Sequence, residues 1–179
     1  MPPGTLYVVA TPIGNLEDLT LRALRTLKEV ALVACEDTRR TRVLLSHYGI
    51  SVPVTSYFEH NKRVKGEVIL RALRDGRSVA LVTDAGTPGI SDPGFRLVKD
   101  ARAEGIPVTP IPGPSAVVTA LSAAGVPADH FVFEGFLPVK PGRNRLAPGK
   151  ADAVILVRAG LVVDPARSGH AVFEAVSIR

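Results

Sequence analysis

The sequence has a single cysteine, Cys35, and no uninterrupted apolar run close to the roughly 18 residues of a membrane helix. One cysteine cannot form an internal disulfide, and no Cys/His spacing resembles a zinc site. Because Cys35 ends an apolar run, we expect it to be buried by packing rather than to act as a nucleophile. The N-terminus also lacks the basic, apolar and small-residue order of a signal peptide. These absences predict a soluble, cytoplasmic protein without a bound metal.

Several common catalytic motifs are absent as well. The loop at residues 11–15 holds one glycine, which argues against a dinucleotide fingerprint, and no G-x-x-x-x-G-K-[ST] run is present for a nucleoside triphosphate. No G-x-S-x-G elbow marks a serine hydrolase, and the four histidines do not by themselves indicate a triad. The chain is therefore a poor candidate for a conventional Rossmann oxidoreductase or a P-loop enzyme.

The charge of the chain is positive but unevenly distributed. Its formal net charge is +5, and residues 141–179 hold 6 Lys and Arg against 3 Asp and Glu. Three local basic clusters, residues 39–42, 61–65 and 140–145, could each bind phosphate or could equally be solvated surface. Aromatic residues form only 5% of the chain, which gives little support to base-stacking platforms.

The first 136 residues alternate β-branched runs with amphipathic segments, a pattern typical of an α/β fold. We predict a mainly parallel five-stranded sheet with helices on both faces. The expected strands are 6–10, 30–34, 52–57, 78–83 and 107–111, with a last strand or linker at 131–136. One helix is expected after the first strand, where Leu21, Leu24 and Leu27 lie three residues apart. The other helices are expected at 38–46, 62–74, 93–104 and 114–125. In the helix at 62–74, we expect Val64, Val68 and Leu73 to face inward and Gly76 to follow the end.

The character of the sequence changes after residue 136. Residues 137–150 are basic and interrupted by prolines and glycines, which predicts a linker. Residues 151–179 contain strand-like runs at 154–157 and 161–163, too little for a complete second domain. We therefore expect an α/β domain at 1–136, a linker at 137–150 and an atypical tail at 151–179.

The most informative loop is residues 84–94, which follows a buried strand and combines glycines, prolines and acids. Asp84 and Asp92 could accept hydrogen bonds from a ribose hydroxyl or an ammonium, and a helix that starts near Pro93 would offer N–H groups to an anion. The alternative is a plain strand-to-helix turn in which Asp92 is the N-cap.

Four loops follow expected strands, at 11–15, 36–39, 84–94 and 112–116. Because parallel strands end at the same edge of a sheet, we expect these loops to converge there. The sequence therefore places a ligand site at the carboxyl edge.

Six segments of this chain, in this order, resemble the small-subunit ribosomal RNA methyltransferases of the tetrapyrrole-methylase family. They are residues 6–16, 36–39, 84–88, 91–94, 112–116 and 133–138, and the resemblance covers residues 5 to about 145. It implies that S-adenosylmethionine is the cofactor. It also implies a reaction, methylation of a cytidine ribose 2′-hydroxyl in 16S ribosomal RNA, and a homodimer that acts on this RNA or on the small ribosomal subunit.

The resemblance also implies site residues. Its cofactor contacts fall on Pro12, Asp84, Ala85, Gly86, Gly113, Ser115 and Ala116. Glu36 and Asp37 end the second strand, so either one could take the hydroxyl proton, although an N-cap or a salt bridge with Arg39 is an equal alternative. The candidate RNA-binding residues are Arg39, Arg40, Lys62, Arg63, Lys140 and Arg143.

The resemblance ends at about Asn144. The family's second domain begins with a Tyr-Glu-Ser-Pro-His-Arg segment, and this chain has no such segment. We therefore expect the second domain to be missing or replaced, through a truncated or frameshifted reading frame or as a divergent short form, with impaired activity as the consequence. Two other functions stay open: a carbon methyltransferase acting on a tetrapyrrole, and a noncatalytic RNA-binding module.

Overall fold

The computed structural model describes residues 2–58, 60–90, 94–125, 128–129, 131–136, 153–157 and 171–174. The chain divides into two compact units, Met1–Pro114 and Ser115–Arg179. The predicted linker at 137–150 lies outside the described residues, and the domain boundaries expected at 136 and 150 stay predictions.

The first unit is built on a five-stranded sheet with the strand order β3-β2-β4-β1-β5. All of its strand pairs are parallel. This confirms the predicted sheet, although each strand is shorter than expected. The strands are β1 (Leu6–Val9), β2 (Leu32–Cys35), β3 (Val54–Ser56), β4 (Val79–Leu81) and β5 (Val108–Ile111).

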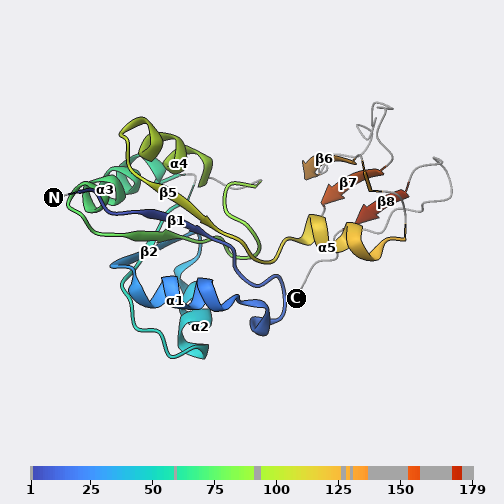
Figure 1. The fold of residues 1–179 in the computed structure, drawn as a ribbon, viewed down its shortest axis with the longest axis horizontal. Coiled ribbons are helices and arrows are strands. Elements are labelled where there is room, and N and C mark those ends of the chain that lie inside the picture. The colour runs from blue at the N-terminus through green and yellow to red at the C-terminus, as the bar shows by residue number, and fades with distance from the viewer. Residues whose placement is uncertain are drawn as a thin grey trace. The chain divides into compact units, whose positions relative to one another are not determined.

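Helices cover both faces of this sheet, as predicted (Figure 1). On one face lie α1 (Leu21–Glu29) and α2 (Thr38–His47), with the short 3-10 helix η1 (Leu16–Asp18) before α1. On the other face lie α3 (Lys62–Arg74) and α4 (Gly94–Ala103). Each layer has its own apolar core because the central strands are buried on both sides.

The buried face of α3 differs from the prediction. Val64 and Val68 were expected to face inward, but they are 71% and 52% exposed. The helix instead buries a stripe at another angle: Gly66, Ile69, Leu70, Ala72 and Leu73. The physical reason is packing against distant residues, because Ile69 and Leu73 belong to a buried core that also contains Leu97 of α4. Of the three residues predicted to face inward, Leu73 is buried and the two valines lie in solvent.

A similar correction applies to α1. Leu21 is 84% exposed, whereas Leu27 is fully buried and Leu24 packs at the edge of the core. Leu21 is the first helical residue, just after the N-cap Thr20, whose hydroxyl accepts the Ala23 N–H at 3.1 Å. A side chain in this position extends beyond the layer that packs on the sheet.

Other local predictions are confirmed. Gly76 and Gly105 adopt φ of +82° and +71° directly after α3 and α4, the left-handed conformation that ends a helix. Cys35 is fully buried, and this burial raises the pKa of its thiol. The cysteine is therefore a packing residue.

The second unit contains α5 (Ala116–Ala123) and a three-stranded parallel sheet with the order β6-β7-β8. Its strands are β6 (Phe131–Phe136), β7 (Ala153–Val157) and β8 (Ala171–Glu174). Residues 131–136 are thus a strand rather than a linker, and the run at 154–157 is also confirmed. The strand β8 was not predicted, and the run at 161–163 lies outside the described residues. Among the described residues, no helix is long and apolar enough to cross a membrane.

Candidate functional site

The loops after β1 and β4 are joined by backbone hydrogen bonds at the carboxyl edge of the first sheet. Thr11 and Gly86 each donate an N–H to the other's carbonyl, at 2.9 and 3.0 Å. The buried Thr11 hydroxyl also donates to the Thr83 carbonyl at 3.0 Å. Gly86 has a φ of +85°, which a residue with a side chain rarely adopts. The glycine predicted from the sequence is therefore needed where the two loops meet.

Asp84 connects the same edge to α2. Its Oδ1 accepts the backbone N–H of Asp37 at 3.0 Å, and its Oδ2 lies 3.5 Å from Nη1 of Arg40. A residue after β4 thus holds the start of the helix after β2. Sequence reasoning predicted Asp84 and Arg40 for different ligands, and the structure brings them together.

The loop after β5 joins the same edge. A Cβ at Gly113 would lie 3.0 Å from Cβ of Ala10, so glycine lets this loop approach the end of β1. The Thr87 hydroxyl donates to the Pro114 carbonyl at 3.4 Å. The predicted convergence of the four loops is confirmed within the first unit.

Asp37 is the N-cap of α2. Its Oδ1 accepts the Arg39 N–H at 2.8 Å, and its carboxylate pairs with the Arg39 guanidinium at 3.3 and 3.0 Å. These hydrogen bonds lower the pKa of Asp37 and raise the pKa of Arg39. The carboxylate is therefore held in its charged form, which makes it a weak proton acceptor.

Glu36 lies beside Asp37 but borders a different space. It lines a small cavity with Tyr57, Thr83 and Pro88, and the glutamate itself is exposed. The two candidate catalytic acids thus have different surroundings, although they are neighbours in the sequence.

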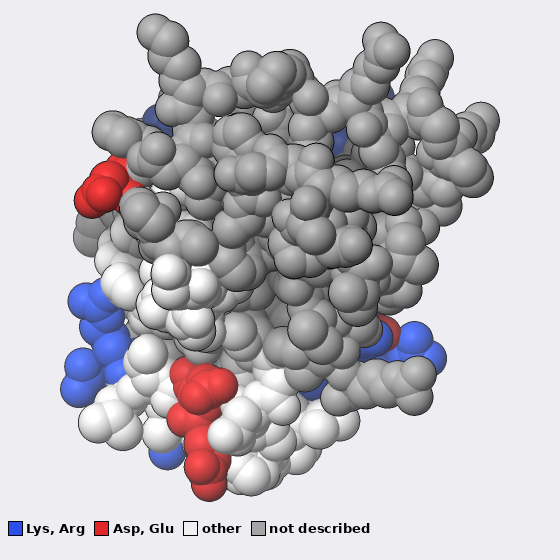
Figure 2. All heavy atoms as spheres, turned by 90° about the vertical axis from the view of Figure 1, so that its right-hand side faces the viewer, with Lys and Arg blue, Asp and Glu red and all other residues white. Residues whose placement is uncertain are grey.

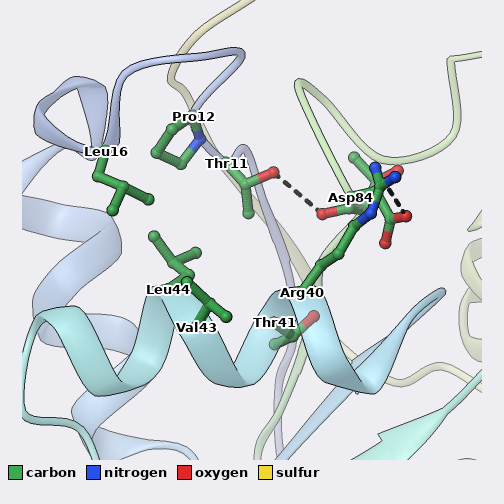
Figure 3. A pocket seen from close by; sticks show the side chains of 9 residues that line it. Thr11, Pro12, Leu16, Arg40, Thr41, Val43, Leu44 and Asp84 are labelled. Carbon is green, nitrogen blue, oxygen red and sulfur yellow. Dashed lines mark hydrogen bonds and ion pairs between the residues drawn. The ribbon is translucent and has the colours of Figure 1, made fainter. Parts of the chain in front are cut away.

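A pocket opens between the loop after β1 and α2 (Figure 3). Arg40 and Asp84 meet at one end, and apolar side chains form the other. Its volume is about 90 Å³, well below the roughly 300 Å³ at the lower limit of small-molecule clefts. The lining residues are Thr11, Pro12, Leu16, Arg40, Thr41, Val43, Leu44, Thr83 and Asp84.

The remaining predicted cofactor residues lie in two places. Ala85 sits between Asp84 and Gly86 in the loop after β4. Ser115 and Ala116 belong to the second unit, where Ser115 is the N-cap residue of α5 but its side chain makes no capping hydrogen bond. Asp92 and Pro93 lie outside the described residues.

The predicted basic residues are only partly described. The side chains of Arg39 and Arg40 are 87% and 70% exposed, while Lys62 and Arg63 begin α3 on the other face of the sheet. Lys140 and Arg143 lie outside the described residues. The face in Figure 2 shows acidic side chains between basic ones in its described part, so the charge there is mixed.

Sequence reasoning missed Thr11 and the apolar wall of the pocket, which is formed by Leu16, Val43 and Leu44. The signal for Thr11 was a hydroxyl residue at the very end of an apolar strand. Val43 had a weaker signal, because an apolar residue next to three arginines in a short helix is equally explained by burial.

The family of the chain follows from this fold and from its sequence. The profile of the Tetrapyrrole (Corrin/Porphyrin) Methylases matches residues 5–166, and the chain belongs to this family. A structure similar to this one is uroporphyrin-III-C-methyltransferase from Thermus thermophilus, with a TM-score of 0.59 and 26% identity over 83% of this chain and 65% of that one. Another structure of the Thermus thermophilus uroporphyrin-III C-methyl transferase, complexed with S-adenyl homocysteine, has a TM-score of 0.54 and 26% identity over 74% of this chain and 59% of that one.

The curated relatives are more similar in sequence. A protein of Pseudomonas aeruginosa named ribosomal RNA small subunit methyltransferase I is 57% identical over 145 residues, 81% of this chain and 51% of that protein. Its namesake in Escherichia coli O157:H7 is 51% identical over 156 residues, 87% of this chain and 52% of that protein. This chain spans about half the length of these relatives.

Proposed function

We propose that this chain takes part in the methylation of small-subunit ribosomal RNA, with S-adenosylmethionine as the methyl donor and a cytidine ribose 2′-hydroxyl of 16S RNA as the acceptor. The observation that supports it most is the sequence identity of 51–57% to relatives named ribosomal RNA small subunit methyltransferase I. The convergence of four loops at one sheet edge provides a place for the chemistry. In this proposal the chain works in the cytoplasm and as a homodimer.

The carboxyl edge has the groups that S-adenosylmethionine requires. The Asp84 carboxylate can accept further hydrogen bonds from a ribose hydroxyl or the ammonium, since each carboxylate oxygen has two acceptor sites. Gly86 and Gly113 present backbone without side chains, and Pro12 adds an apolar surface beside them. When bound, the cofactor supplies an electrophilic methyl group. Ala85, Ser115 and Ala116 complete the proposed contacts.

A proton must leave the ribose hydroxyl during transfer, and Glu36 and Asp37 are the proposed acceptors. Asp37 is occupied by Arg39, which lowers its pKa and favours a positioning role. A carboxylate with a lowered pKa is the weaker proton acceptor, so we propose Glu36 as the base and Asp37 as the positioning residue. Glu36→Gln should reduce the transfer rate more than Asp37→Asn, because asparagine can still cap α2.

The decisive experiment has two parts. Calorimetry measures S-adenosylmethionine binding to this chain, and tritium transfer measures methylation of small ribosomal subunits that lack the modification. Methylated and unmethylated subunits are compared as substrates. We expect label only on the unmethylated subunits, at a cytidine ribose. Binding without any label transfer, from this chain and from a chain extended to the length of its relatives, would overturn the proposal.

A second function is supported by the similarity to structures of uroporphyrin-III C-methyl transferase. In that case uroporphyrinogen, rather than the ribosomal subunit, would take up the label. The identity of 26% to those structures is about half the identity to the ribosomal RNA relatives, so we rank this function second. RNA binding without cofactor binding would instead indicate a noncatalytic RNA-binding module.

A further inference from the structure

The pocket beside α2 has two chemically different ends. Pro12, Leu16, Val43 and Leu44 form an apolar wall, while Arg40 and Asp84 form a charged rim (Figure 3). The charged rim continues directly into the loop after β4, where the proposed cofactor contacts lie. Of the pocket's residues, only Pro12 and Asp84 belong to those contacts. The other lining residues are not among the proposed cofactor contacts.

We propose that this pocket receives the target nucleotide of the RNA, with one face of its base on the apolar wall and an adjacent phosphate on Arg40. This inference rests on the proposed function and deepens it. A volume of about 90 Å³ excludes a whole cofactor molecule but admits part of a single ring. An apolar wall with a guanidinium at its rim matches a base next to a phosphate.

Val43 gives independent support for an apolar ligand. It is 62% exposed although it lies on a helix whose inner side buries Leu44 and Leu45. Its side chain lines the pocket beside Leu44 and faces the same space as Leu16 and Pro12 (Figure 3). A base placed there would cover apolar surface that water now contacts.

Arg40 is more available to a phosphate than its neighbour Arg39. Arg39 makes two side-chain contacts with Asp37, at 3.3 and 3.0 Å, and these resemble a bidentate pair. Arg40 makes one looser contact with Asp84, at 3.5 Å, and its side chain is 70% exposed. Exposed pairs of this kind are weak, so Arg40 can exchange Asp84 for a phosphate oxygen at little cost. The exchange would leave Asp84 with more acceptor capacity for the cofactor.

The test uses this chain with isotope-labelled valine and leucine methyl groups. Two small probes, cytidine and cytidine 5′-monophosphate, are titrated into it at low salt, and their binding is followed by NMR. We expect both probes to shift the methyl signals of Val43, Leu16 and Leu44, and not those of Val64 or Val68. The monophosphate should bind about fivefold more tightly than cytidine, because only it reaches Arg40.

Two variants separate the two ends of the pocket. Arg40→Gln should remove most of the preference for the monophosphate, and Val43→Gln should weaken both probes about threefold. Their matched controls lie on the opposite face of the sheet: Arg96→Gln, whose pair with Asp100 at 3.6 Å is as loose as that of Arg40, and Val68→Gln. We expect both controls to bind like the parent chain.

The outcomes distinguish this inference from the proposed function. Methyl transfer to ribosomal subunits with no probe shift at Val43 would overturn the pocket assignment and leave the proposed function intact. Displacement of the monophosphate by S-adenosylmethionine in direct competition would also overturn it, because the pocket would then belong to the cofactor. A probe-induced shift of the Val43 methyl signals would overturn the proposed function instead if a chain extended to the length of its relatives transferred no methyl group to ribosomal subunits.

Discussion

The two edges of the first sheet are built in opposite ways. At the amino edge, backbone packs on backbone: the Gly4 N–H donates to the Leu73 carbonyl at 2.7 Å, and the Ala31 N–H donates to the Ser78 carbonyl at 2.9 Å. At the carboxyl edge, the backbone hydrogen bonds between Thr11 and Gly86 are joined by side-chain contacts, in which Asp84 bridges Asp37 and Arg40 beside an open pocket. The amino edge is closed mainly by main chain, whereas the carboxyl edge also presents exchangeable polar groups.

This difference separates stability from function in one layer of structure. A closed backbone contact tolerates no added atom, so changes at the amino edge should affect folding. An exposed carboxylate and a loosely held arginine contribute little to folding, so changes at the carboxyl edge should affect ligand binding.

The largest effect on stability is expected from Gly4→Ala. The added Cβ would lie 2.4 Å from the carbonyl carbon and oxygen of Arg77, which are backbone atoms and cannot rotate away. We expect a loss of about 3 kcal/mol in the free energy of unfolding, measured by urea denaturation. Gly66→Ala is the matched control: its Cβ has ordinary contacts, and alanine should stabilise α3 by about 0.5–1 kcal/mol. Equal effects of the two changes would contradict the prediction.

A binding effect without a large stability effect is expected from Asp84→Asn. The amide oxygen can still accept the Asp37 N–H, but the negative charge opposite Arg40 is lost. We expect S-adenosylmethionine affinity to fall about tenfold by calorimetry, since charge-assisted hydrogen bonds are the stronger ones. Asp100→Asn, at the Arg96 pair on α4, is the control and should bind like the parent. A stability loss above about 2 kcal/mol would instead place Asp84 among the structural residues.

Much of the fold and the position of the site could be predicted from the sequence. Local signals were sufficient for β1 to β5, and α3 has the predicted bounds of 62–74. The four loops were predicted to meet because a parallel sheet brings the carboxyl ends of its strands to one edge. Gly86 and Gly113 were predicted as cofactor contacts, and the structure adds that each stands where backbone segments meet closely.

What could not be predicted depends on contacts between residues distant in the sequence. The pairing of Arg40 with Asp84 spans 44 positions, and neither residue shows a local pattern that identifies its partner. The predicted orientation of α3 was wrong because Val64 and Val68 form an apolar stripe as regular as the one that is buried. The buried core that Ile69 and Leu73 share with Leu97 decides between the two stripes, and those contacts exist only in the folded chain.

Arg74 and Arg40 allow a further comparison, between a tightly paired arginine and a loosely paired one. Arg74, near the end of α3, holds Glu67 at 2.8 Å and Glu104 at 2.9 Å, and these pairs raise its pKa. Because all three side chains are partly exposed, Arg74→Gln should lower the free energy of unfolding only modestly, though by more than Arg40→Gln. Arg40→Gln should cost less than about 0.5 kcal/mol, given its single loose pair. High salt should make the unfolding free energies of the two variants more similar. A larger loss of unfolding free energy for Arg40→Gln than for Arg74→Gln would contradict this order.

The smallest effect concerns the pH dependence of folding through Asp37. Its pKa in the folded chain lies below the ordinary value of 3.8, because the side chain and the backbone N–H of Arg39 hydrogen-bond to the charged form. The ionised carboxylate therefore stabilises the fold above that ordinary value, and this contribution disappears as the pH falls through the lowered pKa. Asp37→Asn keeps the N-cap oxygen without the titration. Urea denaturation from about pH 5 downward should show the parent losing more stability than the variant. The difference in stability between the parent and the variant should become smaller in salt, because the ion pair of Asp37 with Arg39 is exposed. Parallel profiles of stability against pH would show that Arg39 does not stabilise the charged form of the Asp37 cap.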